Sequence, residues 1–93
     1  MPFAAVTYVS LEGRDPAVGE QLLREVLIPR LKGLSGFRTA RFLRSLDGKT
    51  GVGAVIFDTE GNAKAGLDAM TTDRPAEAPP VESATTYEVF LEV

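Results

Sequence analysis

Few side-chain types in this sequence could carry out chemistry, and the missing types narrow the choice. The 93-residue chain has no histidine, cysteine or tryptophan, and its single asparagine is Asn62. Without histidine there is no Ser-His triad, no imidazole base and no imidazole ligand for a metal. With cysteine also absent, we expect no metal site, no disulfide and no thiol chemistry. Hydroxyl, carboxylate and guanidinium groups remain.

Four of these side chains are candidates for binding a small ligand. Thr7 and Tyr8 lie in an apolar, β-rich stretch near the N-terminus. Either hydroxyl could face a pocket, although a buried tyrosine hydroxyl can equally satisfy a neighbouring carbonyl. Arg41 presents a planar fork of donors that could bind an anionic or enolate oxygen, or could serve the edge of a dimer. Tyr87 is a candidate of the same kind as Tyr8.

Two further patterns favour structure over chemistry. Asp58 could act as a base, but it precedes an Ala-rich stretch and is better placed to cap a helix. The "GKTG" of residues 48–51 lacks the preceding glycine spacing of a phosphate-binding loop and does not precede a helix. We therefore assign no catalytic residue and no phosphate site.

Composition predicts one domain, residues 1–93, in the cytoplasm. Charged residues make up 25% of the chain and the net charge is -3, which argues against nucleic acid or an anionic membrane as the main partner. No apolar run approaches the ~20 residues that span a bilayer, and the N-terminus has no signal-peptide pattern.

The elements that must position these candidates can be predicted from local patterns. Phe3–Leu11 reads as a strand. A helix should begin after the N-cap Asp15, with Pro16 in its first turn, and run to about Lys32, bent around Pro29.

The arginine-rich stretch that follows has two interpretations. Arg38, Arg41 and Arg44 are three residues apart, which could place them along a helix. Asp47-Gly48 is instead a strong hairpin signal, and the apolar "GVGAVIFD" comes after it. We favour a hairpin of Phe37–Leu46 with the next strand. Strict alternation then places Arg38, Phe42 and Arg44 on one face, and Phe37, Thr39, Arg41 and Leu43 on the other.

The second half repeats the pattern. A helix capped by Asp58 or Thr59 should run to about Met70, a Pro-rich loop should follow over residues 71–83, and a strand should end the chain over Thr85–Val93. Small residues on the helix could leave a cavity against the sheet or could pack closely on it: Ala63, Gly66 and Ala69. The order βαββαβ predicts an α+β, ferredoxin-like domain, a four-stranded antiparallel sheet with two helices on one face.

Such a sheet leaves one face without helices, and that face should carry apolar residues. We expect either the set Phe42, Phe57 and Phe90 or the set Phe37, Ile56, Val89 and Leu91 there. A second copy of the chain would cover such a patch, giving a homodimer through sheet faces and edge strands. An arginine of the second strand would then lie near Glu88 or Glu92 of the other copy, unless these charges are simply solvated.

The whole pattern resembles a dimeric α/β-barrel protein of the antibiotic biosynthesis monooxygenase-like superfamily. The resemblance covers nearly the whole chain and rests on three stretches: "LREVLIPRLKGLSGF", "VGAVIFDTEGNAKAG" and "YEVFLEV". It implies a small-molecule-binding dimer, and an activity like that of a cofactor-independent monooxygenase on a small aromatic or polyketide-like compound.

The catalytic residues of that superfamily do not carry over to this chain. They are a strand asparagine, tryptophan or histidine, whereas Asn62 here starts a helix and the other two types are missing. Haem degradation is therefore not expected. Quinone-forming oxidation, in which the substrate supplies the electrons, needs no cofactor and stays open. The alternative is a non-catalytic structural or regulatory homodimer. An RNA-binding sheet is disfavoured because the chain is acidic and has no aromatic, basic RNP-type motif.

Overall fold

The computed structural model describes residues 1–93 and contains the predicted succession of elements. A π-helical segment, η1, interrupts the first helix. The elements are β1 (Phe3–Ser10), α1 (Pro16–Leu22), η1 (Leu23–Leu27), α2 (Ile28–Lys32), β2 (Phe37–Arg44), β3 (Thr50–Phe57), α3 (Glu60–Thr71) and β4 (Val81–Glu88).

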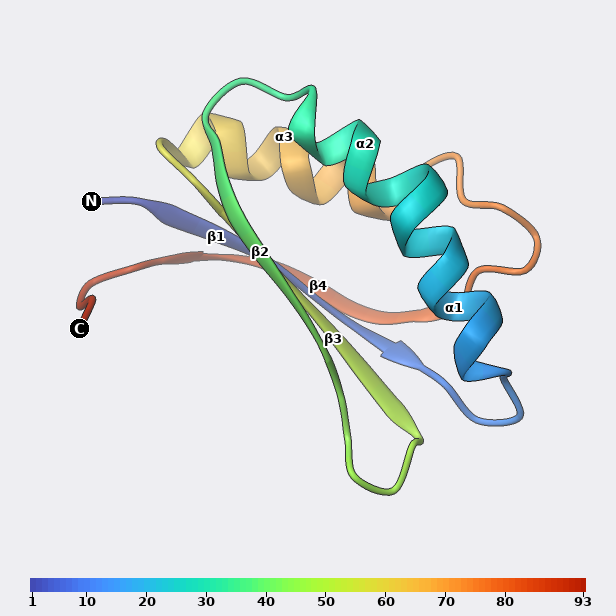
Figure 1. Ribbon diagram of the computed structural model, residues 1–93. Helices are drawn as coiled ribbons and strands as arrows, with labels where there is room; N and C mark the ends of the chain where they lie inside the picture. The colour runs from blue at the N-terminus through green and yellow to red at the C-terminus, as the bar shows by residue number, and fades with distance from the viewer.

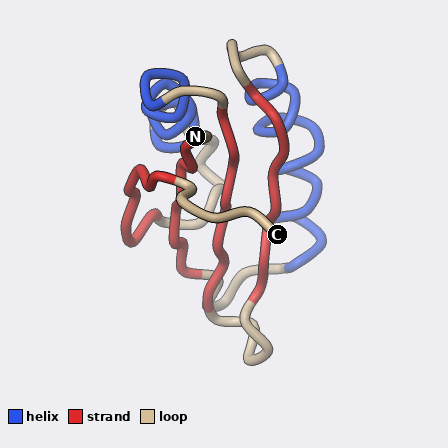
Figure 2. The backbone as a smooth tube through the Cα atoms, turned by 90° about the vertical axis from the view of Figure 1, so that its left-hand side faces the viewer, coloured by secondary structure: helices blue, strands red, loops and turns tan.

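The four strands form one antiparallel sheet in the order β2-β3-β1-β4, with β2 and β4 at its edges. The helices all lie on one side of the sheet (Figure 1), and the strands run side by side in a single layer (Figure 2). The predicted ferredoxin-like arrangement is confirmed. None of the helices has the length and apolar character that crossing a bilayer requires.

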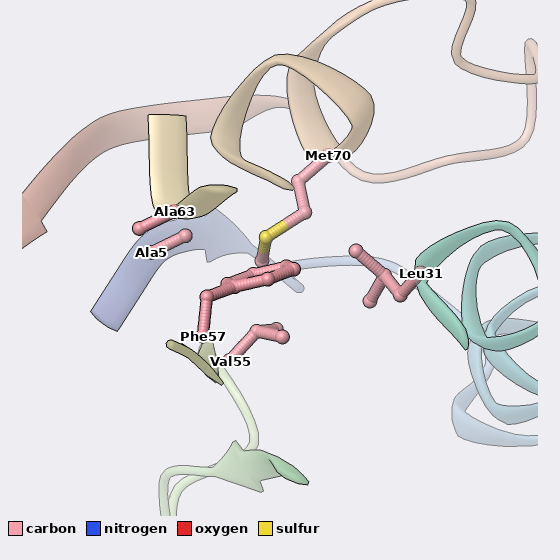
Figure 3. Close-up of a cluster of buried hydrophobic side chains, with 6 residues drawn as sticks. All are labelled: Ala5, Leu31, Val55, Phe57, Ala63 and Met70. Carbon is pink, nitrogen blue, oxygen red and sulfur yellow. The ribbon is translucent and has the colours of Figure 1, made fainter. Parts of the chain in front are cut away.

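The core lies between the sheet and the helices, and Phe57 is at its centre. Six side chains form the cluster shown in Figure 3, and none is more than 2% exposed: Ala5, Leu31, Val55, Phe57, Ala63 and Met70. Alternation along β3 explains the pattern, because Gly51, Gly53, Val55 and Phe57 all face the helices and are buried.

The predicted faces of β2 are wrong at its first residue. The β2–β3 pairing shifts register between Phe37 and Thr39, so two residues of β2 occupy the space of one. Phe37 therefore turns toward the helices, and its ring meets that of Phe57 edge-on with centroids 6.1 Å apart. Beyond the bulge, Phe42 and Arg44 face the helices. Thr39, Arg41 and Leu43 lie on the helix-free face.

The irregularity of the first helix precedes Pro29. Asp15 accepts a hydrogen bond from the Ala17 N–H, as expected of an N-cap. Proline has no N–H, so the carbonyl of Glu25 cannot receive its usual donor from position 29. The helix widens to a π turn, in which the Ile28 N–H donates to the Leu23 carbonyl, before α2 continues to Lys32.

The predicted hairpin is confirmed, and its turn is held by local hydrogen bonds. Gly48 has φ of +76°, a conformation that glycine adopts without strain. The Asp47 carboxylate accepts from the Ser45 hydroxyl at 2.6 Å and from the Lys49 N–H at 3.0 Å. These two bonds hold the pKa of Asp47 below its usual range.

The predicted boundaries of the last strand are wrong. β4 begins at Val81 because it pairs with the end of β1, where Val9 lies opposite Val81. It ends at Glu88 because Glu88 lies opposite Phe3, the first residue of β1. The Val89 N–H still donates to the Pro2 carbonyl, and beyond it no strand remains to pair with. The expected loop over residues 71–83 shortens accordingly.

Candidate functional site: a cleft beneath the first helix

A cleft of about 510 Å³ lies between the first helix and the sheet. Its walls come from α1, η1 and α2 on one side and from the end of α3 with the following loop on the other. Its floor is the helix-facing side of the strands. Apolar residues make up just over half of the lining, including Leu23, Leu27, Phe42 and Met70.

Two glycines of β3 give the cleft its depth. A Cβ on Gly51 would meet Val9 Cγ2 at 2.9 Å, and one on Gly53 would meet both Met70 Cε and Thr7 Oγ1 at 3.0 Å. Any other residue at these positions would push side chains into the space beneath the first helix. The "GVG" of residues 51–53 was the available signal for this cleft, although in the sequence it reads only as part of an apolar strand.

Of the predicted ligand-binding residues, the structure places only Thr7 in the cleft. Thr7 is 5% exposed and lines the cleft. No fully buried polar side-chain atom of the chain lacks a hydrogen-bond partner, so the Thr7 hydroxyl oxygen is not a buried group without one. Tyr8 follows it on β1 and therefore points to the other side of the sheet.

Arg41 and Tyr87 also lie on the helix-free face with Tyr8, but the three do not converge. Tyr8 lies opposite Val52, Arg41 opposite Ala54 and Tyr87 opposite Ala4, so each occupies a different row across the sheet. Arg41 donates to the Thr39 hydroxyl and to the Ala40 carbonyl, both at 3.1 Å. The structure therefore divides the four candidates between two faces.

Two of the three small residues of α3, Ala63 and Gly66, pack closely on the sheet, and the third, Ala69, lines the cleft. A Cβ on Gly66 would lie 2.3 Å from two atoms of the Phe57 ring, and Ala63 is fully buried. Close packing is therefore observed at Ala63 and Gly66, and the cavity alternative holds only at Ala69.

The N-cap of α3 is Thr59 and not Asp58. The Thr59 hydroxyl accepts a hydrogen bond from the Asn62 N–H, whereas Asp58 forms an ion pair with Arg38.

Arginines supply most of the polar groups of the cleft. Four arginines line the cleft: Arg24, Arg30, Arg44 and Arg74. Glu20 is the one carboxylate that lines it. Arg24 is paired with Glu20 at 3.1 Å. None of the other three forms an ion pair within the chain.

Arg30 and Arg74 are held in place by main-chain carbonyls. Arg30 donates to the carbonyls of Ala69 and Thr72, both at 3.2 Å. Arg74 donates to the carbonyl of Met70 at 2.8 Å and to that of Pro79. Burial lowers the pKa of Arg74 from its usual value, because its charge is partly removed from water. No group of three or more histidine, cysteine or acidic side chains lies close enough to hold a metal ion.

Comparison with known proteins identifies the fold. No family model matches the chain, and no curated protein matches it in sequence. Several solved structures match it, and two of them match over nearly its whole length. The structure of Rv0793 from Mycobacterium tuberculosis has a TM-score of 0.69 and 17% identity, covering 99% of this chain and 98% of its own.

The second is a monooxygenase from the gene ActVA-Orf6 of Streptomyces coelicolor, solved in complex with the ligand nanaomycin D. It has a TM-score of 0.64 and 16% identity, and the match covers 98% of this chain and 89% of that one. The chain therefore has the fold expected from the resemblance, and at this identity the likeness concerns the fold alone.

Proposed function

We propose that this chain is a small-molecule-binding protein that holds its ligand in the cleft beneath the first helix. One observation carries the proposal: a space of about 510 Å³ with apolar walls and a few polar groups. Ligand pockets for compounds of drug size typically have volumes of about 300–1,000 Å³ and this mixture of surfaces. The Gly51 and Gly53 floor keeps the space open, and Thr7 supplies a hydroxyl at its base.

The reaction we propose is oxidation of a small aromatic or polyketide-like phenol by molecular oxygen, without a cofactor. The phenol and one O₂ give a quinone and one water, so the substrate supplies all four electrons. In this proposal Thr7 and the arginines hold the ionised phenolic oxygen, and the apolar walls hold the ring. The monooxygenase among the structural matches supports this choice by analogy of fold.

We further propose that the chain works as a homodimer through its helix-free face. Phe42 and Phe57 point to the helices, but Ile56, Tyr8, Leu43 and Tyr87 lie on the helix-free face, and the last three are 41–55% exposed. The tail adds Phe90, Leu91 and Val93, all at least 68% exposed. An apolar face and tail of this extent favour a second copy as their cover.

The proposed charge pairing at the edge strands narrows to one arginine. Arg38 pairs with Asp58 of its own chain, and Arg44 faces the cleft. Arg41 remains on the helix-free face without a carboxylate partner. It is therefore the arginine that we expect to meet Glu88 or Glu92 of the second copy.

Native mass spectrometry followed by an oxygen-uptake assay tests this function. We expect freshly purified protein to weigh as two chains and to bind 1,5-dihydroxynaphthalene, which it would convert to the 5-hydroxy-1,4-naphthoquinone while consuming one O₂. Thr7→Val should weaken binding, whereas Thr85→Val, on the opposite face, should not. Binding without oxygen uptake would favour the non-catalytic alternative, and a protein that binds no aromatic probe would overturn the proposal.

A further inference from the structure

The charge of the cleft opposes that of the chain. The whole molecule carries a net charge of -3. Four arginines and one glutamate line the cleft, which therefore carries a net charge of +3. Because cations gather around this cleft in an otherwise acidic protein, the cleft should attract anions from solution.

The structural roles of Arg30 and Arg74 do not account for this charge. Both guanidinium groups bind carbonyls at the C-terminus of α3, a helix end that favours cations. That end carries an effective charge of only about -0.5, against two full positive charges. Most of the charge of this pair is left without compensation inside the chain.

Free donors remain as well as free charge. A guanidinium group has five N–H donors, and Arg74 uses two of them on Met70 and Pro79. The remaining donors include Nε–H: this nitrogen has no partner within the chain and is not fully buried, so it reaches open space. Carbonyl anchors fix the position of the group, which lowers the entropy cost of using those donors on a ligand.

Arg44 and Arg74 lie at the same level along the strands, on the two sides of the sheet's width. The register places Arg44, Gly51, Val9 and Val81 in one row across β2, β3, β1 and β4. Arg74 is bound to Pro79, two residues before Val81, so the two arginines stand at opposite ends of this row. Neighbouring strands are about 4.8 Å apart, so the row spans three such spacings. Gly51 has no side chain of its own, and the Val9 and Leu11 side chains lie over it between the arginines.

We propose that the ligand of this cleft is an organic anion: an aromatic body bearing a carboxylate, with the carboxylate held between Arg44 and Arg74. The body lies against Phe42 and Leu27, deeper in the same cleft. An anion there compensates the partly buried charge of Arg74 and uses its free donors. This inference rests on the proposed function, since it names the class of ligand for that site.

Paired binding measurements with 2-naphthoate and 2-naphthamide test the inference. The two probes have the same ring and nearly the same size, and only the first is charged. The protein has no tryptophan, so naphthyl fluorescence can be followed directly. We expect 2-naphthoate to bind at least about tenfold more tightly, the difference that one charge-assisted hydrogen bond supplies.

Arg44→Gln should remove most of this preference, and Arg44 is suited to the test because it makes no hydrogen bond or ion pair that the fold requires. Lys49→Gln is the matched control: it removes one positive charge from the same hairpin, outside the cleft. Equal affinity for both probes would overturn the anion inference and leave small-molecule binding intact. Equal losses in the two variants would overturn the placement at Arg44. If neither probe binds at millimolar concentration, both this inference and the proposed function fail.

Discussion

Gly66 of α3 lies against the ring of Phe57 in β3 so closely that a Cβ would fall 2.3 Å from ring atoms Cε2 and Cζ. This approach seats α3 directly on the sheet. The first helix buries only Leu31, in α2, whereas α1 and η1 bury no residue completely, and the cleft lies under them. The helical layer therefore has one half that is packed and one half that is open, and only the open half can hold a ligand.

Gly66→Ala should destabilise the protein by about 1–3 kcal/mol, the usual cost of overpacking a core. Gly61→Ala is the control in the same helix, because a Cβ there meets nothing within 4 Å. Removing an exposed helical glycine should stabilise the protein by up to ~1 kcal/mol. Urea denaturation of the two variants measures both free energies of unfolding. Equal effects of the two substitutions would show that Gly66 is not in close contact with Phe57.

Local patterns in the sequence predicted most of the fold. The Asp15-Pro16 start, the Asp47-Gly48 turn and the strand-like run before Asp58 each have a short-range physical cause, and each lies where it was expected. The end of β4 does not have a local cause. It depends on where β1 begins, because Glu88 is opposite Phe3, and a partner strand is invisible in a residue-by-residue reading.

The candidate site was harder to predict for the same reason. Thr7 and Tyr8 point to opposite faces of one apolar strand, and the strand sequence does not tell which of the two faces the helices cover. Arg30, Arg44 and Arg74 come from three separated segments, and only the fold gathers them around one cleft. The bulge after Phe37 also moves that side chain to the opposite face from the one that strict alternation predicts, and no residue pattern there indicates a bulge.

The hairpin turn should lose part of its stability in acid. The pKa of Asp47 is lowered in the folded protein, first by the Ser45 hydroxyl and then by the Lys49 N–H. Its contribution is therefore complete above the unfolded value of 3.8 and is lost as the pH falls through the lower folded value. The Asp47→Asn variant should have a lower melting temperature than the wild type at about pH 6, and the two melting temperatures should be equal at about pH 2. A gap in melting temperature that is unchanged across this range would contradict the role of the carboxylate.

Leu43→Glu should convert the proposed homodimer to monomers. Leu43 is 55% exposed on the helix-free face, so two copies of the charge would be buried at a two-fold interface. Leu46→Glu is the matched control, since Leu46 is fully exposed in the hairpin turn next to the same strand. Light scattering coupled to size-exclusion chromatography gives the mass of each. Dimers of Leu43→Glu would mean that the interface lies elsewhere.

Two glycines near the hairpin should separate binding from stability. A Cβ on Gly51 meets only the tips of Val9 and Leu11, which can rotate away, so Gly51→Ala should change the free energy of unfolding by less than about 1 kcal/mol. The Val9 and Leu11 tips that it displaces nevertheless move into the cleft between Arg44 and Arg74. We expect the affinity for 2-naphthoate to fall by about tenfold, because the carboxylate can no longer approach both donors.

Gly48→Ala should do the opposite. Its φ of +76° costs an alanine about 1–2 kcal/mol, although a Cβ there meets nothing within 4 Å. Gly48 does not line the cleft, so the affinity of the folded protein for 2-naphthoate should be unchanged. Titration calorimetry and urea denaturation of both variants give the four values. The cleft floor is not the ligand site if Gly51→Ala leaves the affinity intact while remaining folded, whatever Gly48→Ala does to stability.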